Sequence, residues 1–264
     1  TAEDVKDYFN NYVSSKDAKI ISLSNIDKSK IEERFKFLTD WKSKANIPAY
    51  IPCDLPFDTE ITIYNDEDAA QAEIVLGSKG IRKDDTGDYF KIQLLNYILG
   101  GSMNGRLNTV LREKYGYTYG VHSNFVGSTY LDVFRCITSV KPENADSVIV
   151  MMIRTIKDMK ENGITDDEYK MIKDQFKESD MLDAYNKDNR FSYISDLIDS
   201  DFDNNILQHQ KEIIKNITKA ELNGLARKYL YPEFLEVVVV GNQEKLEPRL
   251  SKLDYKLNIC KIVE

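Results

Sequence analysis

The sequence predicts an α+β fold, a two-layer sandwich whose antiparallel-rich mixed sheet is covered on one face by helices. Two observations lead to this prediction. Strand-like segments with alternating apolar residues come in pairs, at 60–64 with 71–76 and at 117–125 with 130–140, and long helical patterns separate the pairs. Gly127-Ser128, between the strands of the second pair, is a hairpin signal, and a hairpin makes its two strands antiparallel.

The segment 1–56 reads as a helix, a strand, a second short helix and a linker. Thr1 can cap the first helix, whose apolar residues recur at helical spacing. A strand is expected at 20–23 and a charged helix at 31–41. The linker is extended because prolines interrupt it. The supporting residues are Val5, Tyr8, Phe9 and Tyr12 on the helix, and Pro48, Pro52 and Pro56 in the linker.

A glycine-rich loop joins two helices within 94–116, and we expect the second helix to end at Gly116 in a left-handed cap. After the hairpin, a long helix begins at Pro142 and ends at Gly163, and Thr165 caps the next helix. The remaining elements follow in order: helices at 189–197, 205–217 and 218–229, a strand at 237–240, a short helix at 244–250 and a strand at 257–262.

The helix–strand unit at the start of the chain recurs near its end, shifted by 217 positions without a gap: Thr1 meets Thr218, Tyr12 meets Tyr229 and Ile20 meets Val237. Either both are the closing unit of one repeat, or two unrelated capped helices each precede a strand. On the first interpretation, residues 1–56 are the closing helix–strand unit of a preceding homologous domain plus a linker. Residues 57–264 then form the whole of the next domain.

Composition narrows the class of partner. The net charge of −8 and the pI near 5.1 argue against nucleic acid, whose recognition usually needs a basic face. No run approaches the ~18 apolar residues of a membrane span, so a soluble protein is expected, with a bacterial cytoplasm and a periplasm equally compatible. Cys53, Cys136 and Cys260 are widely spaced, so neither a disulfide framework nor a structural zinc site is predicted.

A long motif lies between Leu99 and Val121: Leu99-Gly100-Gly101, then Arg106-Leu107, then Leu111-Arg112-Glu113-Lys114 with Gly116, and Tyr119-Gly120-Val121. This stretch resembles the second homology domain of the pitrilysin/insulinase family of zinc metallopeptidases, which includes the mitochondrial processing peptidases. The resemblance implies a chain built from tandem homologous domains with the same two-layer fold, and a role in proteolysis.

In that family an Arg and a Tyr seven positions later reach the active site of a different domain, and Arg112 and Tyr119 have this spacing. The resemblance implies that they bind the substrate carbonyl and the oxyanion that forms on it, for which guanidinium and phenol donors are suited. On spacing alone, the plainer interpretation is that Arg112 is a charged residue on a helix surface and Tyr119 is a residue of an amphipathic strand. Tyr115 and Tyr117 lie close enough to share the assignment.

The glycine-rich loop is expected to let two helices turn sharply. In some family members a glycine-rich segment at this place touches the substrate, so the resemblance also implies a secondary substrate contact at Gly100 and Gly101. The loop is not a phosphate cradle, because G-x-x-x-x-G-K-[ST] is absent.

The family's catalytic signature is H-x-x-E-H on a helix, which sets two zinc-binding histidines beside a glutamate base. This chain has only His122 and His209, and the nearest match to the signature ends in Ile213, which cannot ligate a metal. We therefore predict no metal site and no cofactor in this chain, and expect zinc in a partner domain. Three aspartates imitate the start of an EF-hand loop but lack its glycine and final glutamate: Asp199, Asp201 and Asp203.

The predicted function is that of the metal-free domain of a zinc-dependent peptidase, which closes the substrate chamber and offers Arg112 and Tyr119 to the peptide. Its expected partners are a zinc-bearing homologous domain or subunit and a peptide substrate, and alone it should be inactive. The alternative is a catalytically inactive paralogous domain that acts as a structural or peptide-binding scaffold. An unrelated binding module conflicts with the motif.

Overall fold

The computed structural model describes residues 1–15, 18–41, 58–84, 87–127, 132–176 and 205–261, and also residues 191, 194, 195, 197 and 198. The chain divides into two compact units, which are described separately. Unit 1 is Thr1–Pro52 with Asp183–Asp201, and unit 2 is Cys53–Leu182 with Phe202–Glu264. In the described ranges, no helix combines the length and the apolar character needed to cross a membrane.

Unit 2 is built on one six-stranded mixed sheet with the order β3-β4-β2-β5-β1-β6. β2 pairs antiparallel with β4 and β5, and β3 pairs antiparallel with β4, whereas β1 runs parallel to both β5 and β6. The strands are β1 Glu60–Asn65, β2 Ala72–Lys79, β3 Val121–Gly127, β4 Asp132–Val140, β5 Glu236–Gly241 and β6 Lys256–Lys261. The α+β prediction with an antiparallel-rich mixed sheet is confirmed, and β3 and β4 are the predicted hairpin strands.

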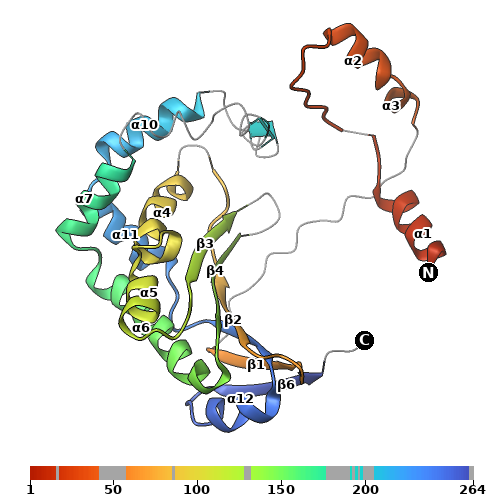
Figure 1. Ribbon diagram of the computed structural model, residues 1–264. Coiled ribbons are helices and arrows are strands. Elements are labelled where there is room, and N and C mark those ends of the chain that lie inside the picture. Colours follow the sequence, from red (N-terminus) through yellow and green to blue (C-terminus); the bar gives the residue numbers. More distant parts are fainter. Residues whose placement is uncertain are drawn as a thin grey trace. The chain divides into compact units, whose positions relative to one another are not determined.

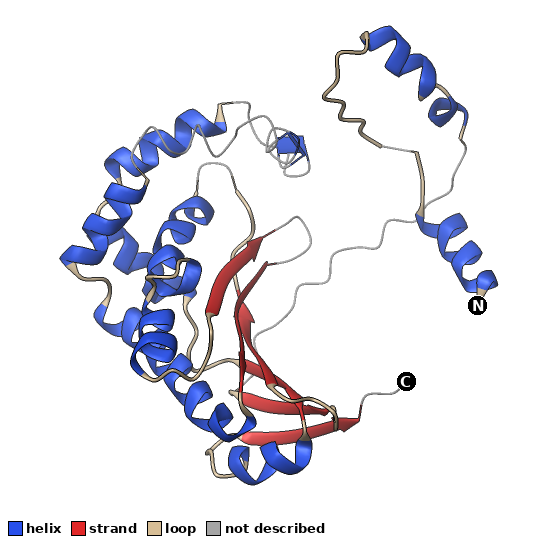
Figure 2. Ribbon diagram, in the orientation of Figure 1, coloured by secondary structure: helices blue, strands red, loops and turns tan. Residues whose placement is uncertain are grey.

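The helices of unit 2 form a layer on one face of the sheet (Figures 1 and 2). They are α4 Asp88–Asn96, α5 Arg106–Asn108, α6 Ala145–Asn162, α7 Asp166–Gln175, α10 Ile206–Asn216, α11 Lys219–Tyr229 and α12 Gln243–Leu250. Two π-helical turns, Tyr97–Gly101 and Thr109–Lys114, continue α4 and α5. The predicted caps are confirmed: Thr165 and Thr218 each form a capping box, and Gly163 ends α6 with a φ of 70°.

Alternation along the strands explains the two layers. Ile61 and Ile63 of β1 are completely buried in the core shared with the helices, whereas Thr62 between them is half-buried on the other face. Ile74 of β2 is likewise completely buried, next to the half-buried Val75. Each fully buried aliphatic side chain stabilises the fold by about 1.5–3 kcal/mol, so this core fixes which face receives the helices.

Unit 1 contains α1 Ala2–Tyr12, α2 Lys28–Arg34 and α3 Phe37–Asp40. Thr1 and Asp4 form the capping box that opens α1, as predicted. The single helix predicted at 31–41 is two short helices. The predicted strand at 20–23 is wrong, because residues 18–23 form no regular element and the described part of unit 1 contains no strand with which they could exchange ladder hydrogen bonds.

The two copies of the predicted repeat agree in their helices but not in their strands. α1 and α11 both have 11 residues and both begin with a threonine capping box, at the predicted shift of 217 positions. β5 has strand neighbours on both sides, whereas its counterpart at 20–23 has none among the residues that the structure describes. The helix predicted at 189–197 lies only partly within the described residues. Several other assignments lie wholly outside them: Asp199, Asp201, Asp203, Cys53 and the linker prolines.

Candidate functional site

The connection between α5 and β3 carries both members of the predicted pair. Arg112 lies in the π-helical turn that follows α5, and Gly116, two residues after the end of this turn, has a φ of 63°. The Gly116 amide donates to the Arg112 carbonyl oxygen at 3.1 Å, and the Tyr117 amide donates to the Leu111 carbonyl oxygen at 2.9 Å. The predicted left-handed cap at Gly116 is therefore confirmed. It turns the chain sharply between Arg112 and Tyr119.

Tyr119 lies two residues before β3, not within the strand as predicted. The Gly120 amide donates to the Thr118 hydroxyl at 3.1 Å, and this local bond turns the backbone before the β4 ladder begins. Tyr119 is 92% exposed, and Arg112 is exposed as well. Neither side chain has a hydrogen-bond or ion-pair partner in the part of the chain that the structure describes. Both are available to a group from outside.

Two threonines hold the backbone on either side of Tyr119. The buried Thr138 hydroxyl donates to the Thr118 hydroxyl at 2.9 Å, and the Thr118 hydroxyl donates to the Ser139 carbonyl oxygen at 3.0 Å. The Thr138 hydroxyl oxygen also lies 2.9 Å from the Gly120 carbonyl oxygen. Tyr119 is thus an exposed phenol on a backbone that is fastened to β4.

The neighbouring tyrosines are arranged differently. The rings of Tyr115 and Tyr117 stack with their centroids 5.5 Å apart, and the Lys114 ammonium lies 5.2 Å from the centre of the Tyr115 ring. Tyr117 also packs against the core. Of the three tyrosines that the sequence left open, Tyr119 is the one with no ring partner among the described residues.

Gly100 and Gly101 lie in the π-helical turn that follows α4, where the turn packs against β3 and α5. A Cβ atom on Gly100 would lie 2.7 Å from the Ser123 hydroxyl and 2.8 Å from the Leu107 side chain. A Cβ atom on Gly101 would lie 2.9 Å from the Asn96 side-chain nitrogen. Close packing therefore explains both glycines, and the substrate contact at Gly100 and Gly101 stays a prediction.

Replacing Gly100 by alanine is expected to lower the free energy of unfolding by about 1–3 kcal/mol, because the added carbon overpacks this contact. Gly224 in α11 is the matched control. Nothing lies within 4 Å of its added Cβ, so Gly224→Ala should stabilise the protein by about 0.5–1 kcal/mol through helix propensity. Urea unfolding measures both. A Gly100→Ala variant as stable as the unmodified protein contradicts the packing explanation.

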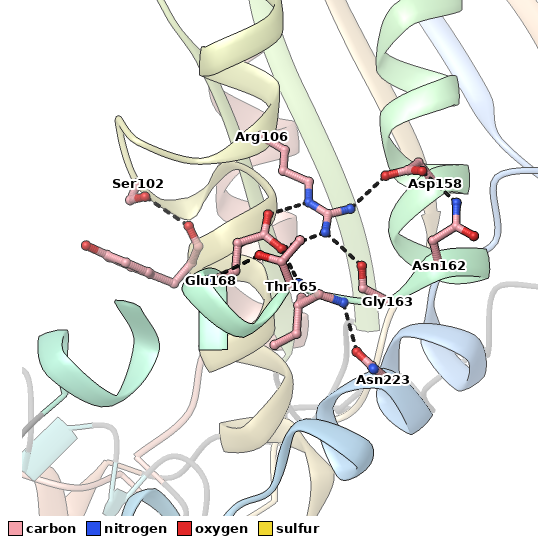
Figure 3. A network of polar contacts seen from close by, with 10 residues as sticks. Ser102, Arg106, Asp158, Asn162, Gly163, Thr165, Glu168 and Asn223 are labelled. Carbon is pink, nitrogen blue, oxygen red and sulfur yellow. Dashed lines mark hydrogen bonds and ion pairs between the residues drawn. The ribbon is translucent and has the colours of Figure 1, made fainter. Parts of the chain in front are cut away.

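A partly buried ion-pair network, which the sequence did not reveal, anchors the start of this connection (Figure 3). Arg106 is the first residue of α5, and its side chain is 15% exposed. Its Nε and Nη2 atoms donate to the two carboxylate oxygens of Glu168 at 2.6 and 2.7 Å. Nη1 donates to Asp158 at 2.9 Å, and Nη2 donates to the Gly163 carbonyl oxygen at 2.7 Å.

This network joins α5 to the end of α6 and the start of α7. Glu168 also accepts a hydrogen bond of 2.7 Å from the Thr165 amide, within the capping box of α7. Burial by itself raises the pKa of Glu168, but the hydrogen bonds from Arg106 and Thr165 outweigh it and hold the pKa below its ordinary value of 4.5. The sequence contained the capping box, but 62 residues separate Arg106 from Glu168 and no local pattern links them.

The part of the chain that the structure describes holds no set of residues that fits a catalytic zinc ion. The H-x-x-E-H signature is absent from the sequence, and the two histidines lie on different elements, His122 on β3 and His209 on α10. Within the described ranges, no group of three or more His, Cys, Asp and Glu side chains could hold a metal ion. Among the cysteines described, Cys136 and Cys260 are free thiols, and burial raises the pKa of Cys136.

Comparisons with known proteins agree with the motif. The family model described as the peptidase M16 inactive domain matches residues 1–176. The chain is 26% identical over 242 residues to the uncharacterized zinc protease YmxG of Bacillus subtilis, covering 88% of this chain and 56% of that protein. It is 32% identical over 98 residues to the uncharacterized zinc protease SCO5738 of Streptomyces coelicolor, covering 37% of this chain and 21% of that protein. The chain spans about half the length of YmxG.

Solved structures share the fold. A peptidase M16 inactive domain from Pseudomonas fluorescens has a TM-score of 0.72 at 20% identity, over 92% of this chain and 58% of that one. A protease from Helicobacter pylori has a TM-score of 0.72 at 17% identity, over 91% of this chain and 59% of that one. A chain of complex III from Candida albicans has a TM-score of 0.62 at 14% identity, over 88% of this chain and 55% of that one. The resemblance to zinc peptidases is thereby confirmed: the chain belongs to the peptidase M16 inactive-domain family.

Proposed function

We propose that this chain is the metal-free part of a zinc-dependent peptidase, where it closes the substrate chamber and offers Arg112 and Tyr119 to the scissile peptide group. The observation that carries the proposal is the exposure of Arg112 and Tyr119 on a connection whose backbone is hydrogen-bonded to β4. Both side chains are exposed and without a partner among the described residues, and the backbone beside Tyr119 is fastened to β4. A backbone that is already fastened limits the reorganisation needed when donors stabilise a developing oxyanion.

Each side chain would have its own task. The Arg112 guanidinium offers paired donors to backbone carbonyl groups of a peptide, and the Tyr119 phenol offers one directional donor to the oxygen that becomes negative. Zinc, its bound water and the general base belong, on this proposal, to a homologous zinc-bearing domain or subunit. We call the combination of that partner with this chain the assembled enzyme.

The sheet face opposite the helix layer supports a role as a chamber wall. Ile137, Val75 and Val238 occupy one row across β4, β2 and β5, because β2 aligns Val75 with both of its neighbours. All three side chains are half-buried. A row of half-buried aliphatic residues on a sheet face suits contact with the side chains of an extended peptide.

A second part of the proposal concerns domain organisation. At the shift of 217 positions, the apolar residues of α1 take the places of buried residues of α11: Val5, Tyr8 and Phe9 correspond to Leu222, Leu225 and Ala226. The α11 residues are 0%, 6% and 0% exposed, whereas their α1 counterparts are 69%, 64% and 48% exposed. This difference supports residues 1–56 as the closing unit of a preceding homologous domain, whose helices would cover α1, and residues 57–264 as the second domain.

Reconstitution tests the proposed function. This chain, the zinc-bearing partner and their mixture are each incubated with quenched fluorescent peptides. We expect hydrolysis by the mixture, and at most residual hydrolysis by either component alone. If the partner alone cleaves the peptides as fast as the mixture, the chain contributes nothing to the reaction and the scaffold alternative replaces this proposal.

A further inference from the structure

Asn108, the last residue of α5, bridges the two ends of the connection that carries Arg112 and Tyr119. Asn108 is 1% exposed. Its side-chain oxygen accepts from the Val121 amide at 3.0 Å, and its side-chain nitrogen donates to the Val121 carbonyl oxygen at 2.9 Å. The same nitrogen donates to the Ser102 carbonyl oxygen at 3.0 Å. Both Arg112 and Tyr119 therefore lie inside a loop that Asn108 closes.

The geometry explains why an asparagine occupies this place. β3 is the edge strand of the described sheet, so one side of its backbone has no strand neighbour among the described residues. The amide of asparagine has the same donor and acceptor groups as a peptide bond, and Asn108 uses both on Val121. Other amides of the helix layer bind β3 further along: Asn96 donates to the Ser123 carbonyl oxygen at 2.8 Å, and Gln93 donates to the Phe125 carbonyl oxygen at 3.0 Å.

We propose that Asn108 is a positioning residue for the Arg112–Tyr119 pair. The inference rests on the proposed function, because it assigns Asn108 a role in the reaction through those two side chains. Without the bridge, Val121 loses both of its Asn108 partners on the outer side of β3, and the connection is held from the β4 side alone where it enters the sheet. Small displacements of catalytic donors cost large factors in rate.

Asn96 is a matched control. It is 4% exposed and makes the same kind of contact with β3, since its nitrogen donates to the Ser123 carbonyl oxygen and its oxygen accepts from the Ser123 hydroxyl at 2.7 Å. Its contact lies at the middle of β3, after the strand has entered the sheet. Loss of Asn96 should therefore destabilise the protein without releasing residues 109–120.

The test compares Asn108→Ala with Asn96→Ala in the assembled enzyme. Both variants should lower the Tm by several degrees, because each leaves buried backbone groups unpaired. Of the two variants, only Asn108→Ala should lower kcat, by about tenfold or more and with little change in KM. In this chain, hydrogen exchange of the amides in 112–121 should speed up in Asn108→Ala and stay unchanged in Asn96→Ala. Adding Asn108→Ala to Tyr119→Phe should cost far less than the product of the two separate losses.

Asn108→Asp keeps the side chain's size and its acceptor for the Val121 amide but has no donor for the two carbonyl oxygens. If Asn108→Ala does not fold, Asn108→Asp replaces it in the test and should show the loss of turnover expected for Asn108→Ala. Equal turnover of the Asn108→Ala and Asn96→Ala enzymes, while Arg112→Ala and Tyr119→Phe lose activity, overturns this inference alone. If Arg112→Ala and Tyr119→Phe keep full turnover, the proposed function fails instead. Unchanged exchange of 112–121 in Asn108→Ala overturns the inference whatever the turnover.

Discussion

Replacing Tyr119 by phenylalanine in the assembled enzyme is expected to lower kcat about 10²-fold, as loss of one oxyanion donor does. Phenylalanine keeps the ring and removes only the hydroxyl. Arg112→Ala should lower kcat by a similar factor, because it removes the paired donors that hold the peptide backbone. Steady-state hydrolysis of a quenched fluorescent peptide, at equal zinc content, gives kcat and KM for each variant.

Tyr115→Phe is the matched control for this prediction. Tyr115 lies on the same connection and is 43% exposed, but its ring stacks on Tyr117. Its turnover should stay within about twofold of the unmodified enzyme. Tyr119 is almost fully exposed, so Tyr119→Phe should leave the free energy of unfolding within about 0.5 kcal/mol. Full turnover in both Arg112→Ala and Tyr119→Phe contradicts the role of the pair.

Removing Arg106 is expected to produce the largest loss of stability, about 3 kcal/mol of the free energy of unfolding. Arg106→Ala leaves Glu168 largely buried without its bidentate partner, and breaking a buried ion pair from one side typically costs about 3–5 kcal/mol. The lower end applies because the two side chains remain 15% and 19% exposed. Urea unfolding of this chain at neutral pH measures the effect.

Glu161→Gln is the control for Arg106→Ala. Glu161 pairs with Lys157 at 3.7 Å, and both side chains are more than half exposed. Its loss should cost less than about 0.5 kcal/mol. The pH dependence gives a second check. Because the folded-state pKa of Glu168 is lowered, the stability from this pair is present above about pH 4.5 and is lost as the pH falls through that folded-state pKa. The expectation fails if Arg106→Ala costs no more than Glu161→Gln.

Elements with a local chemical signal were predictable from the sequence. The capping boxes at Thr1, Thr165 and Thr218 use residues three positions apart, and the structure has all three. Gly116 and Gly163 were expected as helix ends, and both have the positive φ that only glycine adopts without strain. Alternating apolar residues placed β1 and β2, because burial on one face imposes a period of two, and the run of valines at 237–240 placed β5.

Features that depend on distant partners were not predictable. The strand expected at 20–23 had the right residue types but has no neighbour to pair with in the described part of unit 1. Tyr119 fits strand alternation, yet the bond between the Gly120 amide and the Thr118 hydroxyl turns the backbone there, and β3 begins only at Val121. The bridge from Asn108 to Val121 has no periodic pattern, since an isolated asparagine in a sequence indicates neither its burial nor its partner.

The sequence explained the glycine-rich loop only in part, as a sharp turn between two helices. A sharp turn between two helices was expected, and the chain does pass from α4 to α5 there. The structure adds a steric reason, because the faces of Gly100 and Gly101 are filled by side chains of Ser123, Leu107 and Asn96. The contact with Ser123 forms only when β3 packs against the helix layer, so it leaves no trace in the local sequence.

The most direct test of the central claim is the affinity of the assembled enzyme for a peptide analogue with a tetrahedral phosphinate in place of the scissile peptide group. Such an analogue resembles the oxyanion stage of hydrolysis. If Tyr119 donates to that oxyanion, Tyr119→Phe should weaken binding of the analogue about 10²-fold while the KM of the matching substrate peptide changes little. Equal affinity of the unmodified and Tyr119→Phe enzymes for the analogue would contradict the claim.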